Sequence, residues 1–272
     1  MTWHDGQKPG KGDLLLRLFS AAVLIPFALW MVWSGGLVLT LGCALFASIM
    51  AYEWVRMTRS PNLTVMALLA PLTLLAVHWH GLGVGLTGLG VCLLIVGLRH
   101  PVRRKKFAQA LGFLYLVSMP IGLYLLREGP WDGVGAALII MSIVWGSDSA
   151  AYFSGRGFGG PALHPDSPSK TWSGAIGAVI FSVACGALAA GLLNANHVAW
   201  LIMGAFISIF AQLGDMMESS IKRLYRIKDS SGLVPGHGGL LDRVDGLGFT
   251  AVFMVVIFYA SPNLISLLGF AR

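Results

Sequence analysis

The sequence predicts an all-α, polytopic integral membrane protein: a helical bundle of about nine transmembrane helices with a cytoplasmic N-terminus. Three observations lead to this fold class. The 272-residue chain is 56% hydrophobic and only 11% charged, which is less than half the charged fraction of typical soluble domains. Its mean hydropathy is +0.74. Its apolar residues also fall into runs of about twenty, the length that an α-helix needs to cross a bilayer.

The apolar runs divide the chain into nine predicted spans. The first follows a polar start without a small-residue cleavage site, so we expect a retained span and not a signal peptide. Only His78-Trp79-His80-Gly81 separates the third span from the fourth, which is crowded with glycines that predict close helix packing. The spans cover approximately residues 14–34, 36–55, 63–80, 82–98, 107–126, 133–154, 174–194, 198–221 and 246–268.

The basic residues predict which ends of these spans face the cytoplasm. With the N-terminus inside, 17 of the 19 Lys and Arg residues fall on the inner side, and only Arg127 and Arg272 fall outside. Such a bias follows the positive-inside rule and supports both the number of spans and their orientation. The net charge of +7 therefore reflects topology and requires no nucleic acid partner. We interpret the basic cluster at 99–106 in the same way, with some attraction to anionic lipids; a dedicated lipid site is the alternative.

Acidic side chains gather in the second half of the chain. Seven of the twelve acids follow residue 140. Asp148 and Asp215 each precede the inner end of a span by seven residues, a depth of roughly 10 Å at the helical rise per residue. Asp242 and Asp245 open the ninth span from that same side. Because charges inside spans are costly and usually mark a pathway or a site, these carboxylates predict a functional site at the inner face.

The residues around the carboxylates indicate what this site binds. An all-oxygen ligand set without nearby Cys or paired His favours a hard cation, above all Mg²⁺. Asp215, Ser219 and Lys222 lie at i, i+4 and i+7, so they share a helix face. Two inner loops, 155–173 and 222–245, combine glycines with basic residues, a composition that suits phosphate groups. We therefore expect a polyphosphate-bearing substrate that enters from the cytoplasm.

Because the acids and the glycine-rich loops gather in the second half of the chain, the sequence predicts two regions. Residues 1–128 form an N-terminal transmembrane region of about five spans, which carries little that is diagnostic of function. Residues 129–272 form a C-terminal transmembrane catalytic region that includes both cytoplasmic loops.

At these loops the chain resembles a known family. The segment from Gly214 to Arg223 (GDMMESSIKR) and the segment 228–245 (KDSSGLVPGHGGLLDRVD) are similar to the signature of phosphatidate cytidylyltransferases, also called CDP-diacylglycerol synthases. The stretches 148–160 (DSAAYFSGRGFGG) and 167–174 (SPSKTWSG) resemble an upstream loop of that family. Two departures occur there. Ser173 stands where the family usually has an acid, and Gly159-Gly160 stands where it commonly has Gly-Lys.

The resemblance implies a membrane-embedded enzyme of phospholipid biosynthesis that converts CTP and phosphatidate to CDP-diacylglycerol and pyrophosphate. It implies Mg²⁺ as cofactor, with Asp215 and Asp242 as metal ligands, Asp148 as a further candidate, and a second cation left open. The expected location is a bacterial-type inner membrane with the active site facing the cytoplasm. The expected partners are CTP, phosphatidate and membrane lipids, and a homodimer is one assembly that the sequence leaves open.

The resemblance also implies catalytic and substrate-binding roles for residues in and near the two loops. For His237, direct contact with a phosphate and a local structural hydrogen bond both stay open. The expected catalytic residues are Asp215, Lys222, Arg223, Lys228, Asp242, Arg243 and Asp245. The expected substrate-binding residues are Ser219, Asp229, His237, Gly238, Gly239, Ser167, Lys170, Thr171 and Arg156.

Two alternative functions fit the sequence less well. A CDP-alcohol phosphotransferase motif is matched in part by Asp132, Gly133, Ala136 and Gly146, but its Arg position holds Ala137 and its two acids are replaced by Ala150 and Ser154. A cation-coupled transporter would also place acids within spans, yet it would require access from both sides. The acids here collect near one face, which favours the enzyme.

Overall fold

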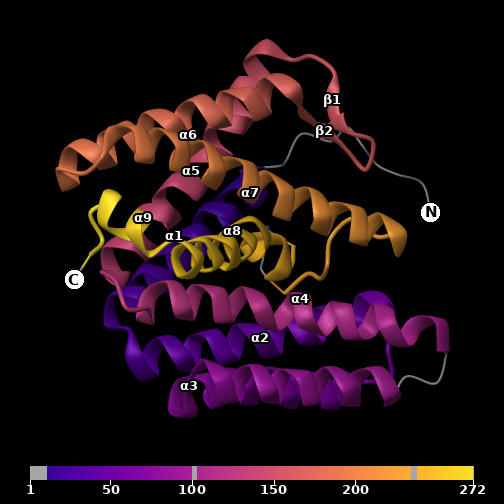
Figure 1. Ribbon diagram of the computed structural model, residues 1–272. Helices are drawn as coiled ribbons and strands as arrows, with labels where there is room; N and C mark the ends of the chain where they lie inside the picture. The colour runs from indigo at the N-terminus through magenta and orange to yellow at the C-terminus, as the bar shows by residue number, and fades with distance from the viewer. Residues whose placement is uncertain (1–10, 100–102, 234–237, 272) are drawn as a thin grey trace.

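The structure is a computed structural model that describes residues 11–99, 103–233 and 238–271. Within these ranges the chain is a bundle of helices with one short β-hairpin (Figure 1). The elements in chain order are α1 (Lys11–Ser34), α2 (Gly36–Thr58), α3 (Leu63–Arg99), α4 (Arg103–Glu128), α5 (Gly133–Phe158), β1 (Ala162–His164), β2 (Ser167–Thr171), α6 (Trp172–Leu193), α7 (His197–Leu224), α8 (Leu241–Ala260) and α9 (Pro262–Leu267).

Helix α3 is two antiparallel halves and not one long rod. Its 37 residues are interrupted at Gly81, whose φ of 82° and ψ of 173° are not helical. The Asn62 side-chain amide donates to the Val96 carbonyl at 3.1 Å, although a straight helix would hold these residues roughly 50 Å apart. The halves correspond to the predicted spans 63–80 and 82–98. The separation of these two spans at Gly81 is therefore confirmed.

The remaining helices match the other predicted spans, with shifted ends. In the described part of the chain, seven helices are long and apolar enough to cross a membrane, with α3 counted once. The described apolar part of α1 is shorter, Phe19–Ser34. Helix α8 begins five residues before its predicted span and ends at Ala260, so a single ninth span over 246–268 was wrong. Pro262 ends it, because proline at the start of α9 supplies no N–H to continue the preceding helix.

The inner loop predicted over 155–173 is more ordered than expected. Helix α5 continues to Phe158, and the chain then forms the antiparallel hairpin β1–β2, in which Ala162 faces Thr171 and His164 faces Ser167. Thr171 ends the hairpin and caps α6, because its Oγ1 accepts the backbone N–H of Gly174 at 3.2 Å. The all-α prediction therefore holds for the spans and misses this small hairpin.

Close helix packing occurs at one of the predicted glycines and at others that were not predicted. A Cβ added at Gly85 of α3 would lie 2.2 Å from Val77 Cγ2 in the other half of the helix, so tight packing is confirmed there. At Gly83, Gly88 and Gly90 an added Cβ would meet nothing within 4 Å, so the prediction was wrong for these three. Helices α6 and α7 also approach closely, through Gly186 and Gly204, where an added Cβ would lie 2.3 Å from a backbone oxygen of the facing helix. These two glycines allow the backbones to touch.

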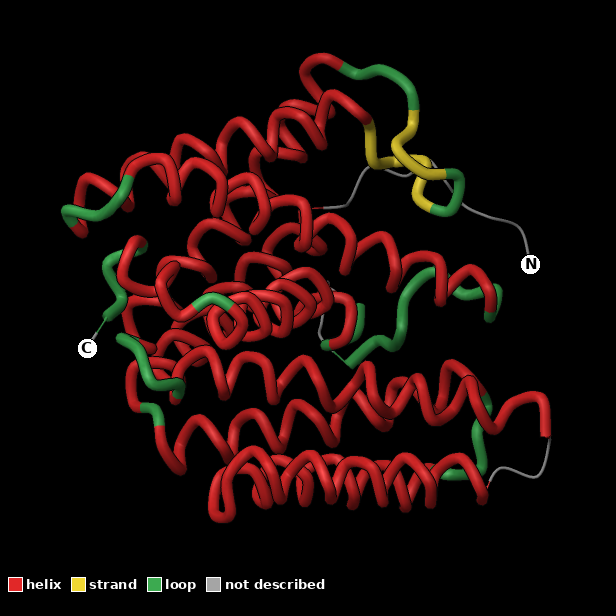
Figure 2. Tube along the Cα trace, in the orientation of Figure 1, coloured by secondary structure: helices red, strands yellow, loops and turns green. Residues whose placement is uncertain are grey.

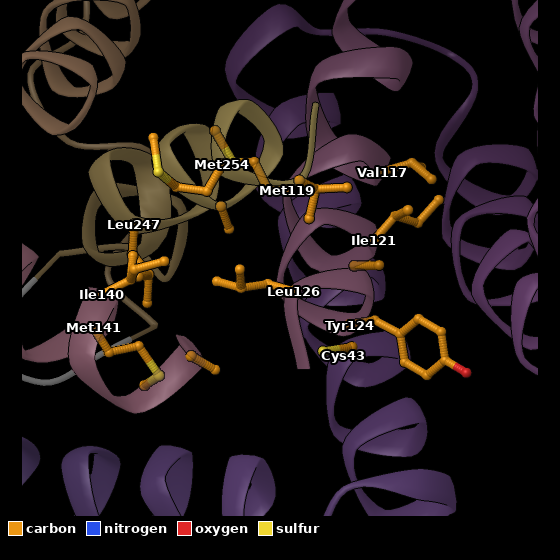
Figure 3. Close-up of a cluster of buried hydrophobic side chains, with 14 of the residues drawn as sticks. Cys43, Val117, Met119, Ile121, Tyr124, Leu126, Ile140, Met141, Leu247 and Met254 are labelled. Atoms are coloured by element: carbon orange, nitrogen blue, oxygen red, sulfur yellow. The ribbon is translucent and has the colours of Figure 1, made fainter. Parts of the chain in front are cut away.

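The core that holds the two halves of the chain together lies between α4, α5 and α8. Met119 and Leu126 of α4, Ile140 and Met141 of α5, and Met254 of α8 are almost fully buried against one another (Figure 3). Helix α4 approaches α8 closely, because an added Cβ at Gly248 would lie 2.6 Å from the Cβ of Met119. The N-terminal region is thus packed directly onto the C-terminal helices.

The connections alternate between the two ends of the bundle as the charge pattern predicted. The α2–α3, α5–α6 and α7–α8 connections lie at one end, on the right of Figure 1. The α4–α5 and α6–α7 turns lie at the other end, close to the C-terminus (Figure 2). The β-hairpin and the segment after α7 are therefore at the same end, although about sixty residues separate them in the sequence.

Candidate functional site

A cavity of about 1140 Å³ lies within the bundle and contains most of the predicted site residues. One part of its wall is apolar and comes from α1, α2 and α4, with Leu24, Phe46 and Leu123 among its residues. The other part is charged and comes from α5, the hairpin, α7 and α8. Its charged side chains are Asp148, Arg156, Lys170, Asp215, Glu218, Lys222, Asp229, Asp242, Arg243 and Asp245.

Lys222 lies at the centre of the charged wall. Its Nζ contacts Glu218 Oε2 at 2.5 Å and Asp242 Oδ1 at 2.8 Å. Glu218 lies one helical turn before Lys222 on α7, and Asp242 lies in the first turn of α8. All three side chains are largely buried. Because a buried charge is costly without a partner, this triad fixes the end of α7 against the start of α8.

Asp242 also organises the segment that precedes it. Both of its carboxylate oxygens accept the backbone N–H of Ser230, at 3.3 Å and 3.0 Å. Oδ2 accepts the N–H of Gly239 at 2.9 Å as well. Gly238 has a φ of 84°, a conformation that side-chain-bearing residues rarely adopt. The predicted catalytic Asp242 therefore holds both Ser230 and Gly239.

The other predicted acids of the cavity come from three helices. Asp215 of α7 forms an ion pair with Lys170 of β2. Asp148 of α5 lines the same cavity. Asp245 of α8 is 7% exposed, and its Oδ1 accepts the N–H of Gly246 at 2.9 Å. The structure thus brings together carboxylates that are almost a hundred residues apart in the sequence, as the common depth of these residues predicted.

Several substrate-binding candidates also reach the cavity. Arg156, Lys170, Thr171 and Asp229 line it, as does the predicted catalytic Arg243. The guanidinium of Arg156 donates to the Tyr152 hydroxyl at 2.7 Å and lies over that ring. This contact fixes the arginine on the part of the cavity wall that α5 contributes.

Other predicted residues lie close to the cavity without lining it. Arg223 donates to the backbone carbonyl of Asp166 at 3.1 Å and to that of Ile227 at 3.0 Å, so it ties the hairpin to the segment after α7. Five other candidates are described by the structure but do not line the cavity: Ser167, Ser219, Lys228, Gly238 and Gly239. His237 lies outside the described residues.

The two departures from the family pattern lie in contact with each other. The Ser173 hydroxyl donates to the backbone carbonyl of Gly159. It also lies 2.9 Å from the Thr171 hydroxyl. Ser173 therefore closes the connection between the end of α5 and the start of α6 by hydrogen bonds to the chain itself.

The sequence reasoning missed two buried acids. Glu218 was not assigned to the site, yet it is 1% exposed and pairs with Lys222. Glu53 of α2 is completely buried and accepts the backbone N–H groups of Leu240 and Leu241, both at 2.8 Å. An acid inside an apolar run was the signal that both residues offered. Glu53 was overlooked because it lies two residues from the predicted end of its span.

The donor groups of the cavity suit a hard divalent cation by their chemistry. Asp148, Asp215 and Asp242 supply only oxygen ligands, which Mg²⁺ prefers. In the described residues, however, no three acidic, His or Cys side chains are grouped as a metal site. Each of the two expected ligands is paired with a lysine, Asp215 with Lys170 and Asp242 with Lys222.

The chain is similar to known proteins over most of its length. A protein of Brucella abortus (strain 2308) named phosphatidate cytidylyltransferase is 36% identical over 271 residues, which cover 95% of this chain and 99% of that protein. A protein of the same name from Pseudomonas aeruginosa is 34% identical over 85% of this chain and 92% of its own length. One from Bacillus subtilis is 35% identical over 53% of this chain. The profile of the cytidylyltransferase family matches residues 15–261, and the chain therefore belongs to that family.

Proposed function

We propose that this membrane protein transfers the cytidylyl group of CTP to phosphatidate and so forms CDP-diacylglycerol and pyrophosphate for phospholipid biosynthesis. The observation that carries the proposal is the two-sided cavity, whose charged wall from α5, the hairpin, α7 and α8 adjoins an apolar wall from α1, α2 and α4. Phosphatidate is amphipathic and requires both. Its acyl chains suit the apolar wall, and its phosphate suits the charged wall.

The reaction places simple demands on the site. A phosphate oxygen of the lipid attacks the α-phosphorus of CTP, and the bond from that phosphorus to the oxygen bridging the α- and β-phosphates breaks as pyrophosphate leaves. The attacking oxygen is already anionic at neutral pH, so no strong general base is needed. The site must instead bring two anions together and hold them in line.

Four basic side chains on the cavity wall meet this demand. They are Arg156, Lys170, Lys222 and Arg243. Lys222 and Arg243 lie beside the first turn of α8, close to the acids of the family signature. We assign them to the phosphates at the reacting centre, where charge-assisted hydrogen bonds act most strongly. Lys170 and Arg156 lie at the hairpin side and suit the polyphosphate tail.

Basic residues alone do not balance the cavity. Six carboxyl groups and four basic side chains line it, so acidic groups outnumber basic groups on its wall. Two anionic substrates would add further negative charge, which cations that enter with them would offset. We therefore propose that Asp215 and Asp242, with Asp148 as a further ligand, hold Mg²⁺ in this cavity. The bound cation would neutralise phosphate charge and help to position the substrates.

The proposed orientation follows from the ends of the bundle. The hairpin and the α7–α8 segment share one end (Figure 1), and the positive-inside rule assigns that end to the cytoplasm. CTP would then reach the cavity from the cytoplasm, and phosphatidate would reach it from the inner membrane.

A purified-protein assay tests the function directly. The detergent-solubilised protein is incubated with CTP, phosphatidate and Mg²⁺, and both pyrophosphate and lipid product are followed. We expect equimolar release of pyrophosphate and CDP-diacylglycerol. Ion flux in proteoliposomes without consumption of CTP would contradict the proposal and favour the transporter.

A further inference from the structure

The carboxylate of Glu53 makes an unusual set of contacts for a residue of the N-terminal region. It is completely buried in α2. Its Oε1 accepts the Ser231 hydroxyl at 2.6 Å and the Leu240 N–H at 2.8 Å. Its Oε2 accepts the Leu241 N–H at 2.8 Å and the Ser230 hydroxyl at 3.3 Å. All four donors lie at least 177 residues further along the chain.

These contacts satisfy the start of α8. The first N–H groups of a helix have no partner within the helix, and Leu240 at the N-cap offers no side-chain hydrogen bond. Glu53 supplies this cap from a different helix. Its negative charge also lies at the positive end of the α8 dipole, which favours it. The first turn of α8 carries Asp242 and Arg243, and its second turn carries Asp245.

The same carboxylate fixes the segment that Asp242 holds. Ser230 donates its hydroxyl to Glu53 and its backbone N–H to Asp242. Ser230 therefore bridges the two acids. Gly239 completes the arrangement, since a Cβ there would lie 1.9 Å from the Ser230 hydroxyl and 2.7 Å from Glu53 Oε1. Ser230, Gly239 and Glu53 therefore pack closely against one another.

We propose that Glu53 is a positioning residue for the cytidylyl transfer: from α2, it holds Ser230, Ser231 and the start of α8 so that Asp242, Arg243 and Asp245 face the cavity. The inference rests on the proposed function. It adds a polar role to the N-terminal region, whose helices α1, α2 and α4 otherwise contribute the apolar wall of the cavity. Glu53 does not line the cavity and touches no substrate in this role, so its effect passes through the α8 residues.

Glu53→Gln is the variant that tests the proposal. It preserves the size of the side chain but removes one acceptor atom and the negative charge. The matched control is Thr58→Val, which removes a buried hydroxyl from the same helix, where it bonds only to the Trp54 carbonyl among the contacts described. For each variant, the CTP-binding stoichiometry is measured by calorimetry, and turnover at saturating CTP and phosphatidate is expressed per CTP-binding site.

A positioning role predicts that turnover per site falls about tenfold or more in Glu53→Gln and stays within about twofold of wild type in Thr58→Val. A merely structural role would lower the number of CTP sites and the rate together, leaving turnover per site unchanged in both variants. That second result would overturn the inference. Absence of cytidylyl transfer by the wild-type protein would overturn the proposed function and with it this inference.

A second variant keeps the test decisive if Glu53→Gln does not fold. Ser231→Ala removes the shortest contact of Glu53 and should lower turnover per site about threefold or more, whereas wild-type turnover would contradict the proposal. Where both variants fold, the double variant should lose less than the product of the two single losses, because both act through one contact. Fully multiplicative losses would show that Ser231 and Glu53 act independently.

Discussion

Lys222 and Asp242 form an ion pair with an Nζ–Oδ1 distance of 2.8 Å, which joins the last turn of α7 to the first turn of α8. Both residues belong to the segment that resembles the family signature. The ion pair brings the end of α7 and the start of α8 together, although twenty residues separate Lys222 from Asp242 in the sequence. Both residues therefore contribute to the same charged wall of the cavity.

The first prediction separates catalytic from topological basic residues. Lys222→Ala or Arg243→Ala should lower turnover at saturating CTP and phosphatidate by at least about tenfold, because each removes a charge-assisted contact that acts in the transition state. Neutralising all four basic residues at 103–106 should leave the turnover of correctly inserted protein within about threefold. The opposite pattern would move the chemistry to the 99–106 segment.

The second prediction concerns the proposed metal ligands. Asp215→Asn and Asp242→Asn should each abolish most turnover, since each removes a ligand charge from a shared cation. They should differ in stability. Asp242 holds Lys222 and two backbone N–H groups, so its variant should also unfold at lower temperature, whereas Asp215 is 39% exposed and makes one ion pair.

Asp132→Asn serves as the control for this pair. Asp132 caps α5 at the opposite end of the bundle, where its carboxylate accepts the Gly135 N–H, and asparagine caps helices as well as aspartate does. Its turnover and thermal midpoint should remain close to those of wild type. Full activity of Asp215→Asn or Asp242→Asn at low Mg²⁺ would exclude that residue as a ligand.

The third prediction uses two glycines of the α7–α8 segment. Gly239→Ala should lower activity at least about tenfold, because its Cβ would lie 1.9 Å from the Ser230 hydroxyl. Gly232→Ala should change activity less than about twofold, since a Cβ there meets nothing within 4 Å. Equal activity of the two variants, measured on protein of equal monodispersity, would show that the segment adapts and that its tight packing is unimportant.

The fourth prediction concerns topology. Reporter fusions at residues 102 and 228 should both report a cytoplasmic location, and a fusion at residue 196 should not. The reason is the alternation of the connections between the two ends of the bundle, combined with the charge pattern of the sequence, which assigns 17 of the 19 Lys and Arg residues to the cytoplasmic side. Locations of 102 and 228 on opposite sides would refute the number of spans.

The parts of this fold that the sequence predicted well are those governed by the bilayer. Hydrocarbon thickness demands apolar runs of nearly fixed length, so the spans before the last were located to within a few residues, including the break at Gly81. The last span was displaced, because α8 ends at Ala260. The hairpin was missed because its strands have only three and five residues and one contains Pro168. Such short strands show no alternation of apolar and polar residues.

The site was predictable where its residues are close together in the sequence. Asp242, Arg243 and Asp245 lie within one segment that resembles the family signature, and they share the cavity wall. Glu53 was not predictable in this way, because its partners are 177 to 188 residues distant and only the folded chain brings them together. A single acid in an apolar run indicates that a partner exists without indicating which one.

The contact between Glu53 and the α8 cap has a consequence for hybrid proteins. We expect that residues 1–128 and 129–272 cannot be exchanged independently between relatives, because the buried carboxylate of Glu53 in the first region accepts the N–H groups at the start of α8 in the second. A chimera that joins the first region of one relative to the second region of another should be active only under two conditions. The first region must carry an acid at the position of Glu53, and the second must carry serines at the positions of Ser230 and Ser231. The two halves of such a protein are therefore expected to be inherited together.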